Sequence, residues 1–297
     1  MKFFSPLRYP GGKLKVSQYI KLLIDTNNLN DGHYVEPYAG GASVALDLLI
    51  NEYVSNIHIN DIDLAIYSFW HSTLYDTENF CKLINDTVVS VEEWKKQKFI
   101  IKNKDQFSAL EIGFSTFFLN RTNRSGILNA GMIGGNEQTG NWKIDARYNK
   151  TDLIKRIELI NRFEDRISLN NMDAVEYVQM IDNTLPNNTL IYLDPPYYKK
   201  GKELYINYYN HEDHKEIADV VKKLTNRYWL VSYDNETAIK ELYSGFRQKI
   251  YSLNYSVGKA SKGSEVIIYN DKLFVPEIEN PTDKKEISNF IKSEIYL

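Results

Sequence analysis

Short β-rich segments alternate with helical patterns at both ends of the chain, and this alternation constrains the fold more than any other feature of the sequence. A strand over 33–38 turns at Ala39-Gly40-Gly41 into an apolar helical run, and a second strand follows over 56–61. Such alternation favours an α/β sheet covered by helices. Further strands are expected over 167–171, 189–193, 227–233, 248–253 and 265–269, with helices over 174–181, 212–224 and 236–243.

The middle of the chain differs from its ends. Between about residues 68 and 163 no segment is convincing as a strand, and lysines, aromatic residues and a glycine-rich stretch over 126–140 dominate. We interpret this part as a mostly helical insertion docked on the sheet domain, which suits a length of 297 residues. The predicted divisions are the sheet domain over 1–67 and 164–275, the insertion over 68–163 and a C-terminal tail over 276–297.

Composition excludes several classes of protein. A single cysteine, Cys81, rules out an internal disulfide framework and a cysteine-rich zinc site, and the five histidines show no metal-ligand spacing. No run approaches the roughly 18 apolar residues that span a bilayer, and the start of the chain has no apolar block long enough for a signal peptide. We therefore expect a cytoplasmic protein that holds no metal ion.

Charge limits the kind of partner. With a net charge of −3, the field of the whole protein does not attract a polyanion, so such a partner would need a local basic patch. Five lysines and no acid fall between Trp94 and Lys104. This run fits a solvated helix face about as well as it fits a patch for a polyanion.

The turn after the first strand gives the first indication of a ligand. Glycines there let the backbone approach a bound group, and the next helix presents free N–H groups at its start. The turn lacks the full Gly-x-Gly-x-x-Gly pattern, and a tight connection explains its glycines about equally well. Asp61 ends the second strand about twenty residues later, where a carboxylate can accept hydrogen bonds from ribose hydroxyls. Together these features favour a nucleoside-containing cofactor.

A sharper signal is the apolar strand over 189–193 that runs into Asp194-Pro195-Pro196-Tyr197. Prolines cannot donate to a β-ladder, so the strand stops there and its exit is stiff. A fixed carboxylate and a fixed carbonyl can hold the exocyclic amine of a nucleobase with its lone pair aimed at an electrophile, while Tyr197 offers a face on which the base can stack. An ordinary Asp-Pro turn at a strand end is the weaker interpretation of the full tetrapeptide.

Four motifs, in this order along the chain, resemble those of the adenine-specific DNA methyltransferases of the DNA adenine methylase (D12) class. They are the segments Leu7–Lys13, Tyr34–Leu46, Asn120–Leu128 and Asp194–Tyr197. The resemblance implies a Rossmann-like sheet that uses S-adenosylmethionine (SAM), with helices on both faces and a helical target-recognition insertion. The sequence departs from the family at Tyr9-Pro10, where Trp-Ala is common, although an aromatic side chain is kept.

The resemblance also implies roles for single residues. Tyr9 and Lys13 would contact SAM, with Lys13 near its carboxylate, and Asp61 would hold the ribose hydroxyls. Asp173 would follow the third strand and meet the adenine of the cofactor. The cofactor loop would be shaped by Glu36, Pro37 and Gly40, and the catalytic set would be Asp194, Pro195, Pro196 and Tyr197, with Asp194 between the cofactor and the target amine.

The implied substrate is an adenine in double-stranded DNA, which has to leave the duplex before its amino group is accessible. Phosphate contacts would offset the cost of extrusion, and Arg124 and Asn123 have side chains suited to reading base edges. The candidates for DNA contacts are Arg121, Asn123, Arg124, Arg147, Lys199, Lys200, Lys202 and Tyr205.

These assignments predict direct methyl transfer from SAM to adenine N6 at a specific site, without a covalent enzyme intermediate. Cys81 agrees, because it is not in a Pro-Cys pair of the kind that cytosine carbon-5 methylation uses. The alternatives are methylation of the cytosine 4-amino group, for which serine more often precedes the prolines, a substrate of RNA or of a protein glutamine, and a DNA-binding protein that binds SAM without activity.

The resemblance leaves the biological setting open. The enzyme would serve as the modification part of a restriction–modification system, beside a companion endonuclease, or as a phage anti-restriction enzyme. We expect it to act as a monomer or weak dimer without a membrane partner, and to associate with the nucleoid through DNA.

Overall fold

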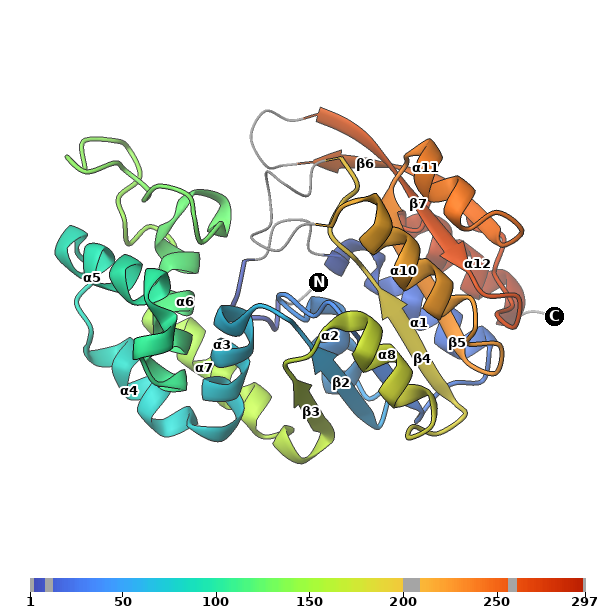
Figure 1. Ribbon diagram of the computed structural model, residues 1–297, viewed down its shortest axis with the longest axis horizontal. Helices are drawn as coiled ribbons and strands as arrows, with labels where there is room; N and C mark the ends of the chain where they lie inside the picture. The colour runs from blue at the N-terminus through green and yellow to red at the C-terminus, as the bar shows by residue number, and fades with distance from the viewer. Residues whose placement is uncertain (1–2, 9–12, 200–208, 256–260, 296–297) are drawn as a thin grey trace. The chain divides into compact units, whose positions relative to one another are not determined.

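A computed structural model describes residues 3–8, 13–199, 209–255 and 261–295, and the chain divides into two compact units (Figure 1). One consists of residues 1–12, 40–43 and 61–171, and we call it the insertion unit. The other consists of 13–39, 44–60 and 172–297, and we call it the sheet unit. The insertion unit extends further at both ends than the insertion expected over 68–163.

Of the seven strands that the described residues form, six belong to the sheet unit. They lie side by side in the order β2 (Asn56–Asn60), β1 (His33–Glu36), β4 (Thr189–Leu193), β5 (Tyr228–Asp234), β7 (Ser261–Tyr269) and β6 (Arg247–Tyr255). The first four are parallel, and β7 is antiparallel to both β5 and β6. Every residue of β4 is buried, as its uninterrupted apolar sequence requires in a strand covered on both faces.

The strand order reverses between β1 and β4. The chain passes from β1 to β2 on one side, and β4 and β5 lie on the other side of β1. In open α/β sheets, ligands bind outside the carboxyl ends of the strands at such a switch point. Glu36 ends β1 and Asp194 directly follows β4, so both lie at these carboxyl ends.

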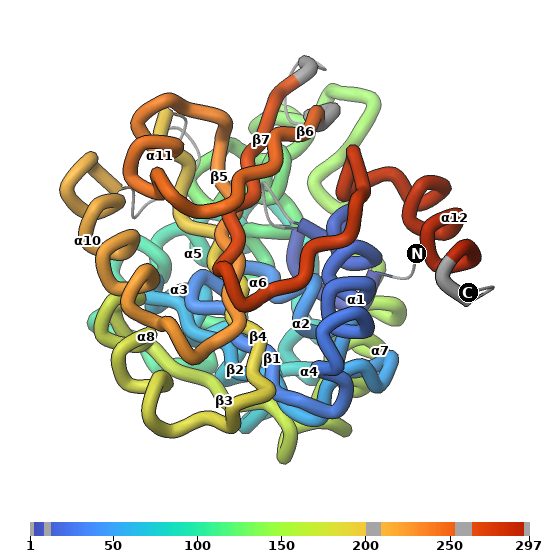
Figure 2. The backbone as a smooth tube through the Cα atoms, turned by 90° about the vertical axis from the view of Figure 1, so that its right-hand side faces the viewer, coloured from blue at the N-terminus to red at the C-terminus, as the bar shows by residue number. Residues whose placement is uncertain are grey.

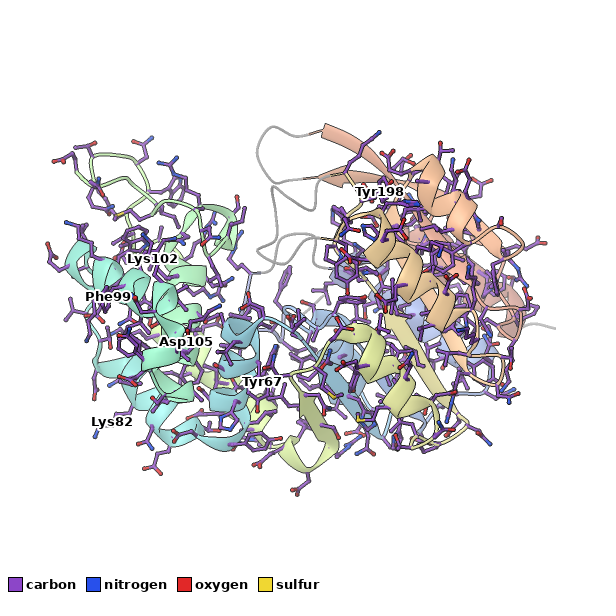
Figure 3. All side chains as sticks on the ribbon, viewed as in Figure 1. Tyr67, Lys82, Phe99, Lys102, Asp105 and Tyr198 are labelled. Atoms are coloured by element: carbon purple, nitrogen blue, oxygen red, sulfur yellow. The ribbon has the colours of Figure 1, made fainter. Side chains whose placement is uncertain are left out.

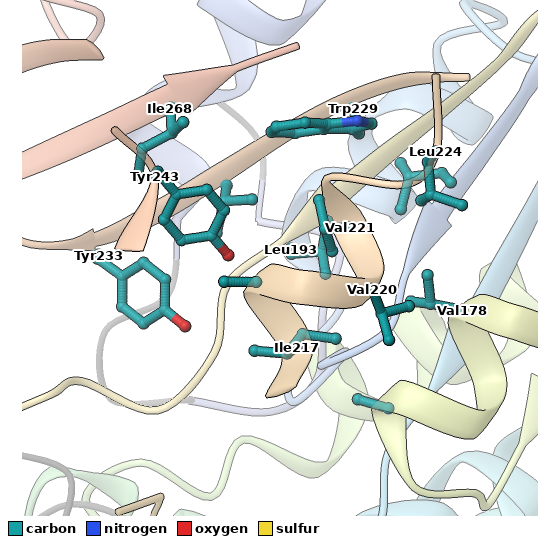
Figure 4. Packing of buried hydrophobic residues seen from close by; sticks show 14 of the residues in the cluster. Val178, Leu193, Ile217, Val220, Val221, Leu224, Trp229, Tyr233, Tyr243 and Ile268 are labelled. Atoms are coloured by element: carbon teal, nitrogen blue, oxygen red, sulfur yellow. The ribbon is translucent and has the colours of Figure 1, made fainter. Parts of the chain in front are cut away.

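Helices cover both faces of this sheet (Figure 2). On one face, α8 (Ala174–Asp182), α10 (His211–Val221) and α11 (Thr237–Leu242) contribute to one apolar cluster that includes Val266 and Ile268 of β7 (Figure 4). On the other face lie η1 (Lys13–Val16) and α1 (Ser17–Thr26), where Tyr19 bonds Tyr269 at 2.9 Å. Alternate strand residues share a face, so Glu265 points to the η1 side with Tyr269. The expected α/β sheet with helices on both faces is confirmed.

Two further helices also belong to this unit. The helix α2 (Ser43–Ile50) follows β1, and α12 (Lys284–Ile295) lies in the segment predicted to be a C-terminal tail. Figure 2 shows α12 beside α1. Its amphipathic sequence buries Ile287 and leaves its lysines exposed.

The insertion unit is mostly helical, as expected. Its elements are α3 (Leu64–Tyr75), α4 (Thr77–Asp86), α5 (Val91–Lys102), η2 (Lys104–Gln106), α6 (Ala109–Thr122), η3 (Arg124–Gly126), α7 (Lys150–Asn161), η4 (Glu164–Arg166) and the short strand β3 (Ile167–Asn170). A capping box of Ser108 and Glu111 starts α6, whose side chains from Ile112 to Thr122 are all buried. Phe117 of this helix stacks on Phe69 of α3.

The lysine run lies on α5 and η2, with Lys102 labelled in Figure 3. Lys95, Lys96 and Lys102 are exposed. Lys98 donates to the carbonyl of Leu128 at 2.6 Å, and Lys104 pairs with Asp63 at 3.3 Å. The run therefore combines solvated lysines with lysines that hold the unit together. Across the described ranges, no helix is long and apolar enough to cross a membrane.

Candidate active site

The site is built around a buried lysine. The Nζ of Lys13, at the start of η1, lies 2.8 Å from Oδ1 of Asp194 and 3.5 Å from Oε1 of Glu265. Its side chain is 7% exposed, that of Asp194 is 23% exposed and that of Glu265 is 1% exposed. One ammonium thus serves two carboxylates, and we call Lys13, Asp194, Glu265, Tyr197 and Tyr251 the carboxylate cluster. The predicted contact of Lys13 with the carboxylate of SAM stays a prediction.

Asp194 is held from the strand beside it. Ser232 of β5 donates to Oδ1 at 2.8 Å, and the Ser232 hydroxyl lies 2.8 Å from the hydroxyl of Tyr192. Burial raises the pKa of Asp194 above its ordinary value; Lys13 acts to lower it and Glu265 to raise it. Burial alone would lower the pKa of Lys13, but Asp194 and Glu265 raise it well above the ordinary range. The lysine therefore stays charged at neutral pH.

Tyr197 is buried inside the cluster, with 3% of its surface exposed. Its hydroxyl donates to Oε1 of Glu265 at 2.6 Å and accepts from Lys13 at 3.2 Å. The ammonium of Lys13 also lies 4.9 Å from the centre of its ring, a cation–π distance. The expected stacking of a base on Tyr197 stays a prediction, and in this structure the ring already contacts a cation.

Asp234, at the end of β5, fixes the exit after the two prolines. It accepts hydrogen bonds from the backbone N–H groups of Tyr198 at 2.8 Å and Lys199 at 3.0 Å. The Lys199 ammonium is exposed and pairs with Glu236 at 2.7 Å. Pro195 is buried and Pro196 is half-buried. The predicted DNA contacts Lys200, Lys202 and Tyr205 lie outside the described residues.

Glu36 organises the turn after β1. It is buried, and its Oε1 accepts from the N–H of Ala45 at 3.0 Å and from the Tyr34 hydroxyl at 3.2 Å. Burial raises its pKa to about 8. The carbonyl of Pro37 accepts from Asn60 at 3.0 Å. These bonds hold the residues that were expected to shape a cofactor loop.

The insertion unit contains the second acidic position. Asp61 accepts from the N–H of Gly40 at 2.9 Å and from that of Asp63 at 3.0 Å, and burial raises its pKa to about 7. Gly40 has a φ of +46°, a left-handed conformation that glycine adopts readily. Its carbonyl accepts from the Trp70 indole at 2.9 Å. Asp61 and the glycine turn are therefore fixed to each other, although they are far apart in the sequence.

The other predicted cofactor contacts can be placed in part. Asp173 begins α8 as its N-cap and accepts from the N–H of Val175 at 2.8 Å. A second cap bond, from the N–H of Glu176 at 3.4 Å, goes to the same carboxylate oxygen, Oδ1. Tyr9 lies outside the described residues.

The arginines of the insertion unit that were predicted to contact DNA differ in how exposed they are. Arg124 and Arg147 are exposed, whereas Arg121 is 7% exposed and its buried Nε has no hydrogen-bond partner among the described residues. Burial, together with the nearby charges of Arg156 and Arg8, lowers the pKa of Arg121 to about 9. Several arginines thus crowd one region of this unit, where an anion would relieve their repulsion.

Asn123 is fully buried and its side chain is occupied. Its Oδ1 accepts from the Trp94 indole at 2.6 Å, and its Nδ2 donates to the carbonyls of Ile127 and Leu128, both at 2.9 Å. The backbone of Asn123 also forms a β-bridge to Met132. Reading a base edge would require these side-chain bonds to break, so this structure gives Asn123 the task of holding the 123–132 loop.

We therefore expect Asn123→Ala to lower the free energy of unfolding by about 2–3 kcal/mol, because three buried bonds are lost. Denaturant unfolding followed by circular dichroism measures this. Asn129→Ala, an exposed asparagine in the same loop, is the matched control and should change stability by less than about 0.5 kcal/mol. Equal stability of the two variants would contradict the loop-holding task of Asn123.

Two positions of the site had no role in the sequence-based assignment. Glu265 lies in the middle of β7, and Tyr251 lies directly opposite it on β6, donating to its Oε2 at 2.5 Å. The one signal in the sequence is a carboxylate at the start of the otherwise apolar strand expected over 265–269. Across the described residues there is no group of three or more acidic, histidine or cysteine side chains arranged to hold a metal ion.

Comparison with known proteins identifies a family. The family described as D12 class N6 adenine-specific DNA methyltransferase matches residues 9–257. The chain is 24% identical over 266 residues to the type II methyltransferase M.MjaIII of Methanocaldococcus jannaschii, covering 82% of this chain and 89% of that protein. It is 25% identical over 232 residues to the modification methylase StsI of Streptococcus sanguinis, covering 71% of this chain and 32% of that protein.

Solved structures are also similar to this chain. A SAM-dependent methyltransferase from Agrobacterium tumefaciens has a TM-score of 0.37 and 9% identity, with coverage of 86% of this chain and 62% of that one. The rRNA methyltransferase aviRa from Streptomyces viridochromogenes has a TM-score of 0.36 and 8% identity, with coverage of 86% and 85%.

Proposed function

We propose a mechanism that proceeds from the family, since the chain belongs to the D12 class of N6 adenine-specific DNA methyltransferases. The protein is accordingly a SAM-dependent enzyme with a Rossmann-like fold that methylates adenine in DNA. Our proposal is that it acts at a specific site in double-stranded DNA, on an adenine turned out of the helix, and transfers the methyl group directly to N6.

The observation that carries this proposal is the position of Asp194. It directly follows β4 at the switch point of the sheet, and its carboxylate is fixed by Lys13 and Ser232. In our mechanism, Asp194 accepts a hydrogen bond from the adenine amino group and stabilises the positive charge that develops on N6. Because one ammonium serves both Asp194 and Glu265, Asp194 keeps part of its negative charge for this task.

The chain's residues fit the cofactor. Bound SAM supplies a methyl group on a positively charged sulfur. We assign Asp61 to the ribose hydroxyls, since its buried carboxylate is fixed by the Gly40 turn, and Asp173 to the adenine of the cofactor. Glu36 holds the loop after β1 through Ala45. Positioning by these groups, without a covalent enzyme intermediate, supplies the rate.

Base flipping is testable without turnover. We expect a duplex with 2-aminopurine at the target position to become at least about fivefold more fluorescent when the enzyme and S-adenosylhomocysteine (SAH) are added, because the extruded base loses its stacking partners. A duplex with 2-aminopurine two positions away is the control and should stay dim. Equal fluorescence of the two duplexes would exclude extrusion of the target base.

Contacts with the DNA backbone would offset the cost of unstacking. We assign these to the exposed Arg124 and Arg147 and to the crowded Arg121 of the insertion unit, and to Lys199 of the sheet unit. Lys200, Lys202 and Tyr205 follow Lys199 in the sequence and belong to the same proposal.

A role in restriction–modification is proposed from the relatives. One is named a modification methylase and the other a type II methyltransferase. DNA methylated by this enzyme should then resist an endonuclease that cuts the same site, and cleavage of fully methylated DNA by every such endonuclease would argue against the role. We also propose that the enzyme acts as a monomer or weak dimer. Analytical ultracentrifugation tests this.

A further inference from the structure

We propose that Glu265 is a positioning residue of the active site that shares the ammonium of Lys13 with Asp194, and thereby makes the site favour the charged sulfonium of SAM over the neutral thioether of SAH. This inference rests on the proposed function, because it concerns the same cluster. It adds to the mechanism a task for Glu265 in discriminating between the two forms of the cofactor.

The carboxylate of Glu265 is fixed by hydrogen bonds to both of its oxygens. Strand β7 places it on the face that carries η1, in register with Tyr251 on β6 and Asp234 on β5. Tyr197 donates to one of its oxygens at 2.6 Å and Tyr251 donates to the other at 2.5 Å. Each oxygen of Glu265 is thus held in place by its own hydroxyl donor.

The shared ammonium connects Glu265 to the reacting groups. Lys13 lies 2.8 Å from Asp194 and 3.5 Å from Glu265, so its charge is divided between them. Without Glu265, Lys13 would neutralise Asp194 alone, and the site would offer less negative potential to a sulfonium and to a positively charged N6. In a buried site, such a change acts at low effective dielectric and is strong.

Tyr197 links Glu265 to the active site in a second way. Its hydroxyl bridges Glu265 and Lys13, and its backbone belongs to the stiff exit after β4. Glu265 therefore fixes both the charge beside Asp194 and the side chain that follows the two prolines.

The titration of Asp194 offers an independent readout. Glu265 raises the pKa of Asp194 while Lys13 lowers it. The other titratable groups that act with Asp194 are Glu36 and Tyr34 of β1, Tyr192 of β4 and Tyr233 of β5. Removing the charge of Glu265 should therefore lower the pKa of Asp194 and shift the acid limb of activity to lower pH.

The test is Glu265→Gln, with SAM and SAH binding measured by calorimetry in the absence of DNA. The two ligands differ by one methyl group and the charge on sulfur, so general damage to the pocket weakens both alike. We expect the ratio of the SAH Kd to the SAM Kd to fall about five- to tenfold. We also expect kcat to fall about 10- to 100-fold with little change in the KM for DNA.

Asp47→Asn is the matched control. Asp47 is a buried carboxylate of α2, in the same unit, that pairs with Lys21 at 2.8 Å and has no contact with the cluster among those observed. We expect its loss to lower stability but to leave both the SAM-to-SAH preference and the acid limb as in the wild type.

The outcomes separate this inference from the proposed function. If the wild type methylates DNA but Glu265→Gln keeps the wild-type ligand preference and acid limb, the inference is wrong and the function stands. If the wild type transfers no methyl group to DNA, the function itself fails. Should Glu265→Gln not fold, Lys13→Met tests the same sharing of charge, because it removes the ammonium and leaves both carboxylates. The preference for SAM over SAH should then rise. A preference that does not rise would overturn the inference.

Discussion

Asp194→Ala is expected to reduce the rate of methyl transfer by about 10³-fold, because the variant loses the acceptor that orients the amine and the charge that stabilises the transition state. Binding of the duplex should change by less than about threefold, since Asp194 lies in the site for the base and contacts no phosphate in our mechanism. Single-turnover transfer from labelled SAM, measured beside a filter-binding isotherm for DNA, gives both quantities.

The control for Asp194→Ala is Asp219→Ala on α10. Asp219 is an exposed acid that pairs with Lys222 at 2.9 Å, and its loss should leave both quantities at wild-type levels. Near-normal transfer by Asp194→Ala would refute the mechanism. Loss of DNA binding equal to the loss of transfer would move Asp194 from the chemistry to DNA recognition.

Lys13→Met has the second large expected effect. It leaves Asp194 and Glu265 as buried carboxylates without the ammonium that they share, so the free energy of unfolding should fall by about 3–5 kcal/mol. Lys13 lowers the pKa of Asp194, so its removal should raise that pKa. Because the mechanism needs ionised Asp194, the acid limb of the kcat profile should move to higher pH.

Lys21→Met is the control for this variant. Lys21 is also a buried lysine of the sheet unit, 2.8 Å from a buried aspartate, Asp47. It should show a comparable loss of stability with an unchanged acid limb. If the acid limb of Lys13→Met stays at the wild-type pH, or moves to lower pH, then Lys13 does not lower the pKa of Asp194.

Local signals in the sequence predicted the scaffold of the site. The apolar run of β4 and the two prolines that end it indicated a buried strand with a stiff exit, and the structure has that strand over Thr189–Leu193. The turn at Gly40 and the position of Asp61 likewise follow from short patterns, and the structure joins the two by a hydrogen bond.

Contacts between distant segments could not be predicted in the same way. The place of Glu265 depends on the antiparallel register that sets it opposite Tyr251, and no periodicity in either strand fixes that register. Asn123 shows the same limit: its polar side chain suggested a DNA contact, but the loop over 123–132 folds back and buries it. Side-chain chemistry was visible in the sequence, whereas burial was decided by the tertiary fold.

The most direct test of the account is the identity of the methylated nucleoside. The purified enzyme is incubated with labelled SAM and unmethylated duplex DNA, the DNA is digested to nucleosides, and these are separated by chromatography with mass detection. We predict label in N6-methyl-2′-deoxyadenosine alone, at one sequence context, and about 10³-fold slower labelling when Asp194→Ala replaces the wild type. Label in N4-methylcytosine, or its incorporation into RNA or protein instead of DNA, would contradict the account.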